Sequence, residues 1–323
     1  MLPNGTRLGA HLPLGKGMVW AANRAAEIGA SALQVFTDNP ASWRRRAGPP
    51  RELPAFRERL AELGIEPLVV HAPYLINLAA PEADPRERSI DRLANELRVA
   101  EAYGAQYVNV HIGSHRGDGT AAGIDRVAAG VRDVLDRLDG EARDVVIVLE
   151  NGTGGGFGLG SRMEELGAID RAIRATGVAD ERYGFCLDTA HLWGAGYRID
   201  RAAGVDVTVA AFDEQVGLER LRLVHLNDSR SDLASRFDRH EHIGAGRIGA
   251  EGLARVVTHP ALRGATFVLE TPGMDEGYDS VNMARVGDIV AGRPLDPLPP
   301  AAFHTRSAKG RSAPADDDGP GGA

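Results

Sequence analysis

Short apolar runs rich in β-branched residues recur along the chain, separated by segments in which apolar residues have helical spacing. In one such segment Ile90, Leu93 and Leu97 share a helix face, and Gly104 follows where a left-handed C-cap would end the helix. The apolar runs, each expected to form a strand, lie at residues 7–12, 32–37, 67–72, 107–112, 144–150, 183–188, 221–227 and 266–271.

Strands that are hydrophobic along their whole length and alternate with helices indicate a parallel sheet covered on both faces. Eight such units favour a closed α/β structure, a (β/α)8 TIM barrel, over an open sheet. We find no linker that divides the chain, so residues 1–303 are expected to form a single domain. Residues 304–323 contain almost no apolar side chains and are predicted to be a disordered polar tail.

Composition narrows the class of protein. With 323 residues, 43% of them hydrophobic, the chain can bury a full core. A net charge of −8 argues against a broadly basic nucleic-acid-binding surface but leaves room for a local one. No run approaches the roughly 18 apolar residues of a membrane span, and no signal peptide opens the chain, so we expect a cytoplasmic protein without membrane contact. The single cysteine, Cys186, excludes an internal disulfide and falls in a predicted strand, where a buried thiol is expected.

Polar residues mark the ends of six consecutive predicted strands. One strand-end histidine usually has a structural role, but unrelated structural roles would have to recur six times here. A barrel gathers these ends at one rim, where its active site lies, and imidazole and carboxylate groups are typical zinc ligands. The six residues are His71, His111, Glu150, Asp188, His225 and Glu270.

Two further motifs add three candidates. The segment "SRFDRHEHIGAG" (235–246), by itself more typical of a solvated loop, carries Asp238 and His240, which alternate as on one face of an extended chain. The motif "LDTAH" places His191 three residues after Asp188. The nine candidates are five His, two Asp and two Glu. Nine ligands are too many for one tetrahedral ion and about right for three, so we expect a trinuclear metal site at the rim.

Other polar features are assigned no ligand role. The glycine stretch 151–160 lacks GxGxxG spacing and is expected to form a rim loop. The arginine run 44–46 suits either a solvated surface or phosphate contact. Structural or surface roles are expected for His11, His115, His242, His259 and His304.

Several motifs in order resemble the endonuclease IV family of apurinic/apyrimidinic (AP) endonucleases, from about Leu8 to Ile289. They read "HAPYLINLAAP", "LENGTGGGFGLG", "LDTAHLWGAGY", "HLNDSRSDLASRFDRHEHIGAG" and "VLETPG". The resemblance implies a TIM barrel with three zinc ions per chain, manganese being an alternative at one site. It assigns His71 and His111 to one ion, Asp188, His225 and Glu270 to a second, Glu150 as a bridge between these two, and His191, Asp238 and His240 to the third.

The same resemblance implies hydrolysis of DNA 5′ to an abasic site during base excision repair. Four carboxylates against three dications leave a charge of roughly +2, which suits a phosphodiester. Two of the ions would share the attacking hydroxide. Glu150 and Glu270 are the expected catalytic residues, orienting or deprotonating the water.

The expected partner is double-stranded DNA containing abasic sites, bound by a monomer without an obligate protein partner. The resemblance and the rim position indicate Asn39, Arg45, Tyr74 and Leu75 as substrate contacts. One position departs from the family, since Ala41 stands where members carry an arginine that wedges into DNA.

Two alternatives from other classes remain at this point. A xylose-isomerase-like sugar isomerase or epimerase would also gather metals at this rim, although such sites rely more on carboxylates. A non-catalytic binder of damaged DNA would be compatible with Ala41, although it would not need nine intact ligands.

Overall fold

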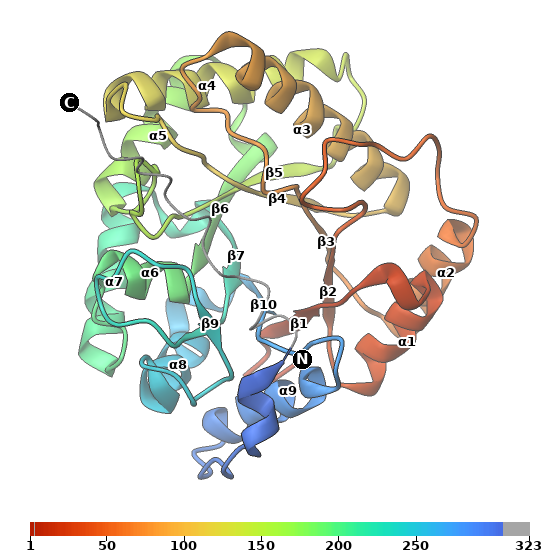
Figure 1. Ribbon diagram of the computed structural model, residues 1–323, viewed down its shortest axis with the longest axis vertical. Helices are drawn as coiled ribbons and strands as arrows, with labels where there is room; N and C mark the ends of the chain where they lie inside the picture. Colours follow the sequence, from red (N-terminus) through yellow and green to blue (C-terminus); the bar gives the residue numbers. More distant parts are fainter. Residues whose placement is uncertain (3, 306–323) are drawn as a thin grey trace, which may run out of the picture.

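The computed structural model describes residues 1–2 and 4–305, and these form a closed barrel of parallel strands (Figure 1). The barrel order is β1-β10-β7-β6-β5-β4-β3-β2, so the first and last strands pair and close the ring. The strands are β1 (Arg7–His11), β2 (Ala32–Val35), β3 (Leu68–His71), β4 (Tyr107–His111), β5 (Val146–Glu150), β6 (Tyr183–Asp188), β7 (Leu221–His225) and β10 (Thr266–Leu269). The predicted TIM barrel is confirmed, with strand ends within about two residues of expectation.

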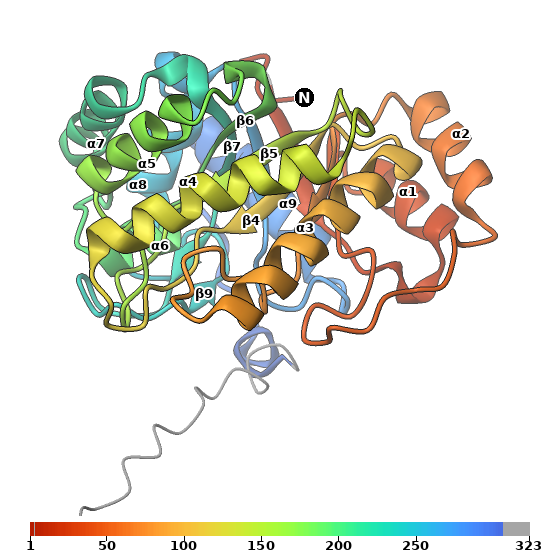
Figure 2. The ribbon, with the colours of Figure 1, turned by 90° about the horizontal axis from the view of Figure 1, so that it is seen from above.

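Helices surround the barrel and shield the outer faces of its strands (Figures 1 and 2). Ile90, Leu93 and Leu97 are buried in α3, and Gly104 takes the left-handed conformation (φ 76°) that ends this helix, as predicted. The helices are α1 (Met18–Glu27), α2 (Leu53–Leu63), α3 (Ala83–Tyr103), α4 (Thr120–Arg137), α5 (Met163–Ala175), α6 (Thr189–Ala195), α7 (Ala202–Gln215), α8 (Gly249–Thr258) and α9 (Tyr278–Val290). None of the described helices combines the length and apolarity that a membrane span requires.

The apolar side chains that point into the barrel show how its strands orient the rim residues. A buried cluster separate from the main core consists of Val69, Val148, Cys186 and Leu223. Each of these lies two residues before a strand-end His, Glu or Asp, and side chains two apart on a strand share a face. The barrel interior therefore changes from apolar to polar along each of these strands, and the polar layer lies at the carboxyl ends.

Two excursions complete the rim. After β7 the chain forms a small antiparallel pair, β8 (Asp228–Ser229) with β9 (His240–Glu241), which returns the segment 235–246 to the rim. After α9 the chain forms a 3-10 helix, η5 (Pro300–His304). The polar tail expected from His304 lies, from residue 306 onward, outside the described residues.

Candidate metal centre

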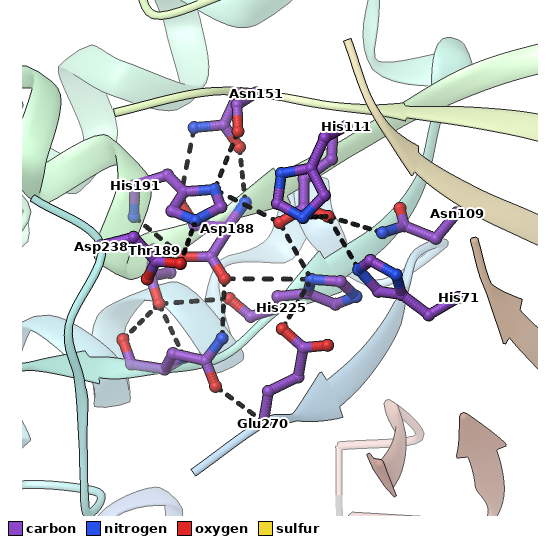
Figure 3. Close-up of polar contacts among 12 residues, drawn as sticks. His71, Asn109, His111, Asn151, Asp188, Thr189, His191, His225, Asp238 and Glu270 are labelled. Carbon is purple, nitrogen blue, oxygen red and sulfur yellow. Dashed lines mark hydrogen bonds and ion pairs between the residues drawn. The ribbon is translucent and has the colours of Figure 1, made fainter. Parts of the chain in front are cut away.

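The carboxyl-terminal rim brings all nine predicted ligands together. Six of them come from strand ends, His191 from α6, and Asp238 and His240 from the β8–β9 excursion. Figure 3 shows how the side chains of several of these residues face one another, among them His71, His111, Asp188, His191, His225, Asp238 and Glu270. In three groups the donor atoms lie within 4.8 Å of one another: His71, His111 and Glu150; Glu150, Asp188, His225 and Glu270; and Asp188, His191 and His240. Asp238 joins the last group, since its carboxylate oxygens lie 3.4 Å from His191 Nε2 and 3.0 Å from His240 Nε2.

Three of the histidines are oriented by backbone carbonyls. The Nδ1 atoms of His71, His191 and His240 lie 2.7–2.9 Å from the carbonyl oxygens of Ala72, Asn151 and Glu270, respectively. A carbonyl only accepts, so each Nδ1 carries a proton, and in the neutral form that a metal ion binds each Nε2 keeps its lone pair. Those Nε2 atoms face carboxylates of the cluster, an arrangement typical of metal-binding histidine.

The "LDTAH" motif forms the start of α6. Asp188 is the N-cap residue, and its Oδ1 accepts a hydrogen bond of 2.8 Å from the His191 backbone N–H. Its Oδ2 accepts from Asn227 Nδ2 at 2.7 Å and lies 3.6 Å from His240 Nε2. The cap thus fixes Asp188 between the second and third groups of candidate ligands.

The centre stabilises charge that burial alone would oppose. Burial disfavours the ionised form of Glu150, but His111 and His225 outweigh it and hold the pKa of Glu150 well below its ordinary value. Burial likewise opposes ionisation of Asp238, and His240 and His191 reverse the effect on its pKa. Anionic oxygens and imidazole lone pairs directed at common points are the donor set that borderline divalent metals select, so the residues fit the expected ions.

Four residues at this site were not anticipated. His11 was expected to be structural or on the surface, and its Nδ1 lies 3.2 Å from Glu270 Oε1, a structural contact made directly to a candidate ligand. Gln34, Asn109 and Asn227 are fully buried and donate to Glu270, Glu150 and Asp188, respectively. The available signal was a polar residue inside an apolar strand, in "ALQVFT" and "YVNVHI".

His242 shows the contrasting case, a histidine two residues from a candidate ligand with a structural role. Its Nε2 donates to the Ala302 carbonyl at 2.9 Å, and its Nδ1 accepts from Asn282 Nδ2 at 2.9 Å. Both nitrogens are used, so His242 is a packing residue that fastens η5 to the loop, as expected.

Tyr74 stands over the centre and separates two hollows. Its ring lies 5.6 Å from the His71 ring and 5.9 Å from the His111 ring, and the residue is 47% exposed. A cavity of about 250 Å³ on one side includes His11 and Glu270, and one of about 340 Å³ on the other includes His111 and Asp238. Leu75, beside Tyr74, is half-buried.

The loop after β2 carries the other predicted substrate contacts but keeps them outside the polar centre. Asn39 and Arg45 are exposed, and Asn39 Oδ1 accepts from the Ala41 backbone N–H at 3.0 Å, a local turn contact. Arg92, buried in α3, fastens this loop through the Arg44 carbonyl at 3.4 Å and pairs with Glu96 at 2.8 Å.

Comparison with known proteins identifies the class and then the family. A family model described as a xylose isomerase-like TIM barrel matches residues 22–287. The chain is 39% identical over 282 residues to a probable endonuclease 4 of Methanoculleus marisnigri, covering 87% of this chain and 98% of that protein. A probable endonuclease 4 of Natranaerobius thermophilus is 40% identical over 284 residues, covering 88% and 98%. The crystal structure of endonuclease IV from Thermus thermophilus superposes with a TM-score of 0.76 at 38% identity, covering 88% of this chain and 99% of that one.

The chain is therefore a xylose isomerase-like TIM-barrel protein, and within that class it belongs to the endonuclease IV family. A D-tagatose 3-epimerase-like protein superposes with a TM-score of 0.64 at 17% identity, covering 88% of this chain and 97% of that one. That likeness concerns the fold alone. The sugar-isomerase alternative thus accounts for the barrel but not for the sequence.

Proposed function

We propose that this protein is a metal-dependent phosphodiesterase that cuts the DNA backbone 5′ to abasic sites and leaves a 3′-hydroxyl. The observation that carries the proposal is the convergence of nine imidazole and carboxylate side chains in a chain of the endonuclease IV family. The proposed substrate is duplex DNA with an abasic site, and the proposed setting is base excision repair. A monomeric, cytoplasmic protein remains the prediction from sequence.

The proposed ions are zinc, three per chain, with manganese as an alternative at one site. His71 and His111 would hold one, Asp188, His225 and Glu270 a second, and Glu150 would contact both. His191, Asp238 and His240 would hold the third. Bound there, the ions would supply positive charge for the phosphate and lower the pKa of a water molecule.

The residues of the chain itself would prepare the reaction in two ways. Glu150 and Glu270 are the proposed catalytic carboxylates, and both are positioned by amides, Asn109 at 2.5 Å and Gln34 at 2.6 Å. A carboxylate held in this way can orient an attacking water without reorganising during the reaction. Burial of the centre beneath Tyr74 also limits competing water.

The proposed DNA contacts surround this centre. Tyr74 and Leu75 would insert beside the abasic nucleotide and offset part of the cost of unstacking the duplex. Asn39 and Arg45 would meet the backbone from the loop after β2, where Ala41 supplies no cation. Flipping a nucleotide that lacks its base costs less free energy, because no base has to be unstacked and unpaired, and this favours damaged DNA over intact DNA.

The deciding experiment is incubation with a duplex that carries one tetrahydrofuran abasic analogue. We expect a single nick 5′ to the analogue, with a 3′-hydroxyl end that a polymerase extends. An undamaged duplex of the same sequence should stay intact, and prolonged chelation should abolish nicking until zinc is restored. Tight binding without nicking by zinc-loaded protein would favour the non-catalytic binder, and turnover of a ketose without nicking would favour the isomerase.

A further inference from the structure

Gln34 is a fully buried amide in β2, a strand to which no candidate ligand was assigned. Its Nε2 donates to Glu270 Oε1 at 2.6 Å. Its Oε1 lies 3.0 Å from His225 Nε2. Since a carboxylate only accepts hydrogen bonds, the nitrogen of Gln34 must face Glu270 and the oxygen must face His225. A flipped amide would place its oxygen against the Glu270 carboxylate, which has no proton to donate, so the Glu270 contact fixes the orientation of Gln34.

This orientation determines which atoms of its two partners remain for an ion. An amide oxygen accepts, so the Nε2 that faces it carries a proton; in the neutral form that a metal ion binds, His225 keeps its lone pair on Nδ1. Glu270 uses Oε1 toward Gln34, and its Oε2 lies 3.2 Å from His225 Nδ1. The same Nδ1 lies 3.3 Å from Glu150 Oε1. The two atoms that Gln34 leaves free thus face each other inside the centre.

His225 differs in this respect from the three histidines whose Nδ1 atoms meet backbone carbonyls. Those present Nε2 to the centre, whereas His225 presents Nδ1 because a side-chain amide holds its Nε2. A backbone carbonyl survives any substitution, but this orientation depends on one replaceable side chain.

We infer that Gln34 is a positioning residue for the second metal site, selecting Nδ1 of His225 and Oε2 of Glu270 as the donor atoms. The inference rests on the proposed metal-dependent function. Partners of this kind typically change metal affinity by about 10–100-fold when they are removed, because the ligands lose their preset orientation.

The test compares Gln34→Met with Gln106→Met by competition for zinc against a graded series of chelators. Methionine keeps the unbranched shape of glutamine and removes its polar contacts with Glu270 and His225, together with a contact of 3.0 Å between Gln34 Nε2 and His11 Nδ1. Gln106 is an exposed residue just before β4, at the opposite end of the barrel, where it contacts the Leu68 N–H and the Gly104 carbonyl. We expect Gln34→Met to weaken one zinc equivalent about 10–100-fold and to leave two unchanged, and Gln106→Met to alter none.

The outcomes separate this inference from the proposed function. Three equivalents in the wild type with the same affinities in Gln34→Met would overturn the role of Gln34 alone. No zinc bound by the wild type would overturn the metal-dependent function and this role with it. A readout that needs no variant is the long-range ¹H–¹⁵N spectrum of the zinc-loaded wild type, in which His225 should be protonated at Nε2. Protonation at Nδ1 would overturn the inference even if Gln34→Met failed to fold.

Discussion

Buried charged side chains occur at both ends of the barrel, but they are used differently. At the amino-terminal end, Arg220 lies before β7 with its guanidinium 3.9 Å over the ring of Tyr183 and 3.3 Å from Asp170. Tyr183 also donates to Asp170 at 2.9 Å. In this cluster the permanent cation Arg220 pairs with the anion Asp170, and the three side chains contact one another. At the carboxyl-terminal end the acids face imidazoles whose lone pairs converge, so ions of higher charge can bind.

The difference teaches that burial of charge alone does not mark a functional site. An arginine satisfies a carboxylate completely and offers no lone pair, so the Arg220 cluster can only stabilise the fold. A neutral imidazole offers a lone pair whose direction depends on what holds its other nitrogen. The kind of partner, and the direction in which it is held, separates the two ends.

The largest effect should come from Glu150→Gln at the carboxyl-terminal end. A neutral amide is a poor ligand between two dications, so cleavage of abasic duplex should fall by several orders of magnitude. Nicking rates and thermal unfolding of the variant, measured side by side, provide the check. Cleavage within tenfold of wild type would show that Glu150 does not contact both ions.

His240→Ala should impair one of the three proposed metal sites at the carboxyl-terminal end. Elemental analysis should find about two zinc ions per chain in place of about three, because imidazole contributes much of the affinity of one site. His242→Ala is the matched control, and it should retain the full metal content while loosening η5. Equal metal loss in both variants would mean that the loop, rather than the ligand, was being measured.

Arg220→Met, at the amino-terminal end, should lower stability and leave activity intact, the reverse of what is expected for Glu150→Gln. It leaves the buried Asp170 with Arg174 at 2.8 Å and Tyr183 at 2.9 Å as its remaining partners, so the free energy of unfolding should fall by about 2 kcal/mol. The specific activity of the folded enzyme should stay near wild type, since the cluster lies at the opposite end from the proposed chemistry. Unfolding monitored by circular dichroism tests the loss of stability, and nicking assays well below the melting temperature test the retained activity. A large loss of activity in folded protein would contradict the division between the two ends.

The smallest effect should arise at the carboxyl-terminal end but away from the candidate ligands, in the exposed loop after β2. Ala41→Arg should tighten binding to abasic duplex and steepen its salt dependence by about one unit of slope, as one added phosphate contact does. Arg45→Ala should change both quantities in the opposite direction, and turnover at saturating substrate should stay unchanged in both variants. Fluorescence anisotropy titrations at several salt concentrations measure this. If only Arg45→Ala has an effect, the arginine run has already replaced the missing wedge cation.

The sequence by itself determined the barrel and the positions of the nine candidate ligands. Apolar runs alternating with helical periodicity specify parallel strands, and a residue at a strand's carboxyl end must lie at the rim in this fold. The motif around Asp188 also encodes its own helix cap, because a cap needs only residues three apart. Local spacing was sufficient for these features.

Only the tertiary structure decided which polar residues support the ligands. His11 meets Glu270 across 259 positions because pairing of β1 with β10 closes the barrel, and Gln34 meets His225 across 191 positions. His242 is structural because η5, 60 residues later, supplies a carbonyl to its Nε2. The sequence does not specify these contacts by pattern, since each depends on where two distant segments pack. Which nitrogen of His225 faces the centre is decided by that packing, whereas for His71 the carbonyl of the next residue decides it.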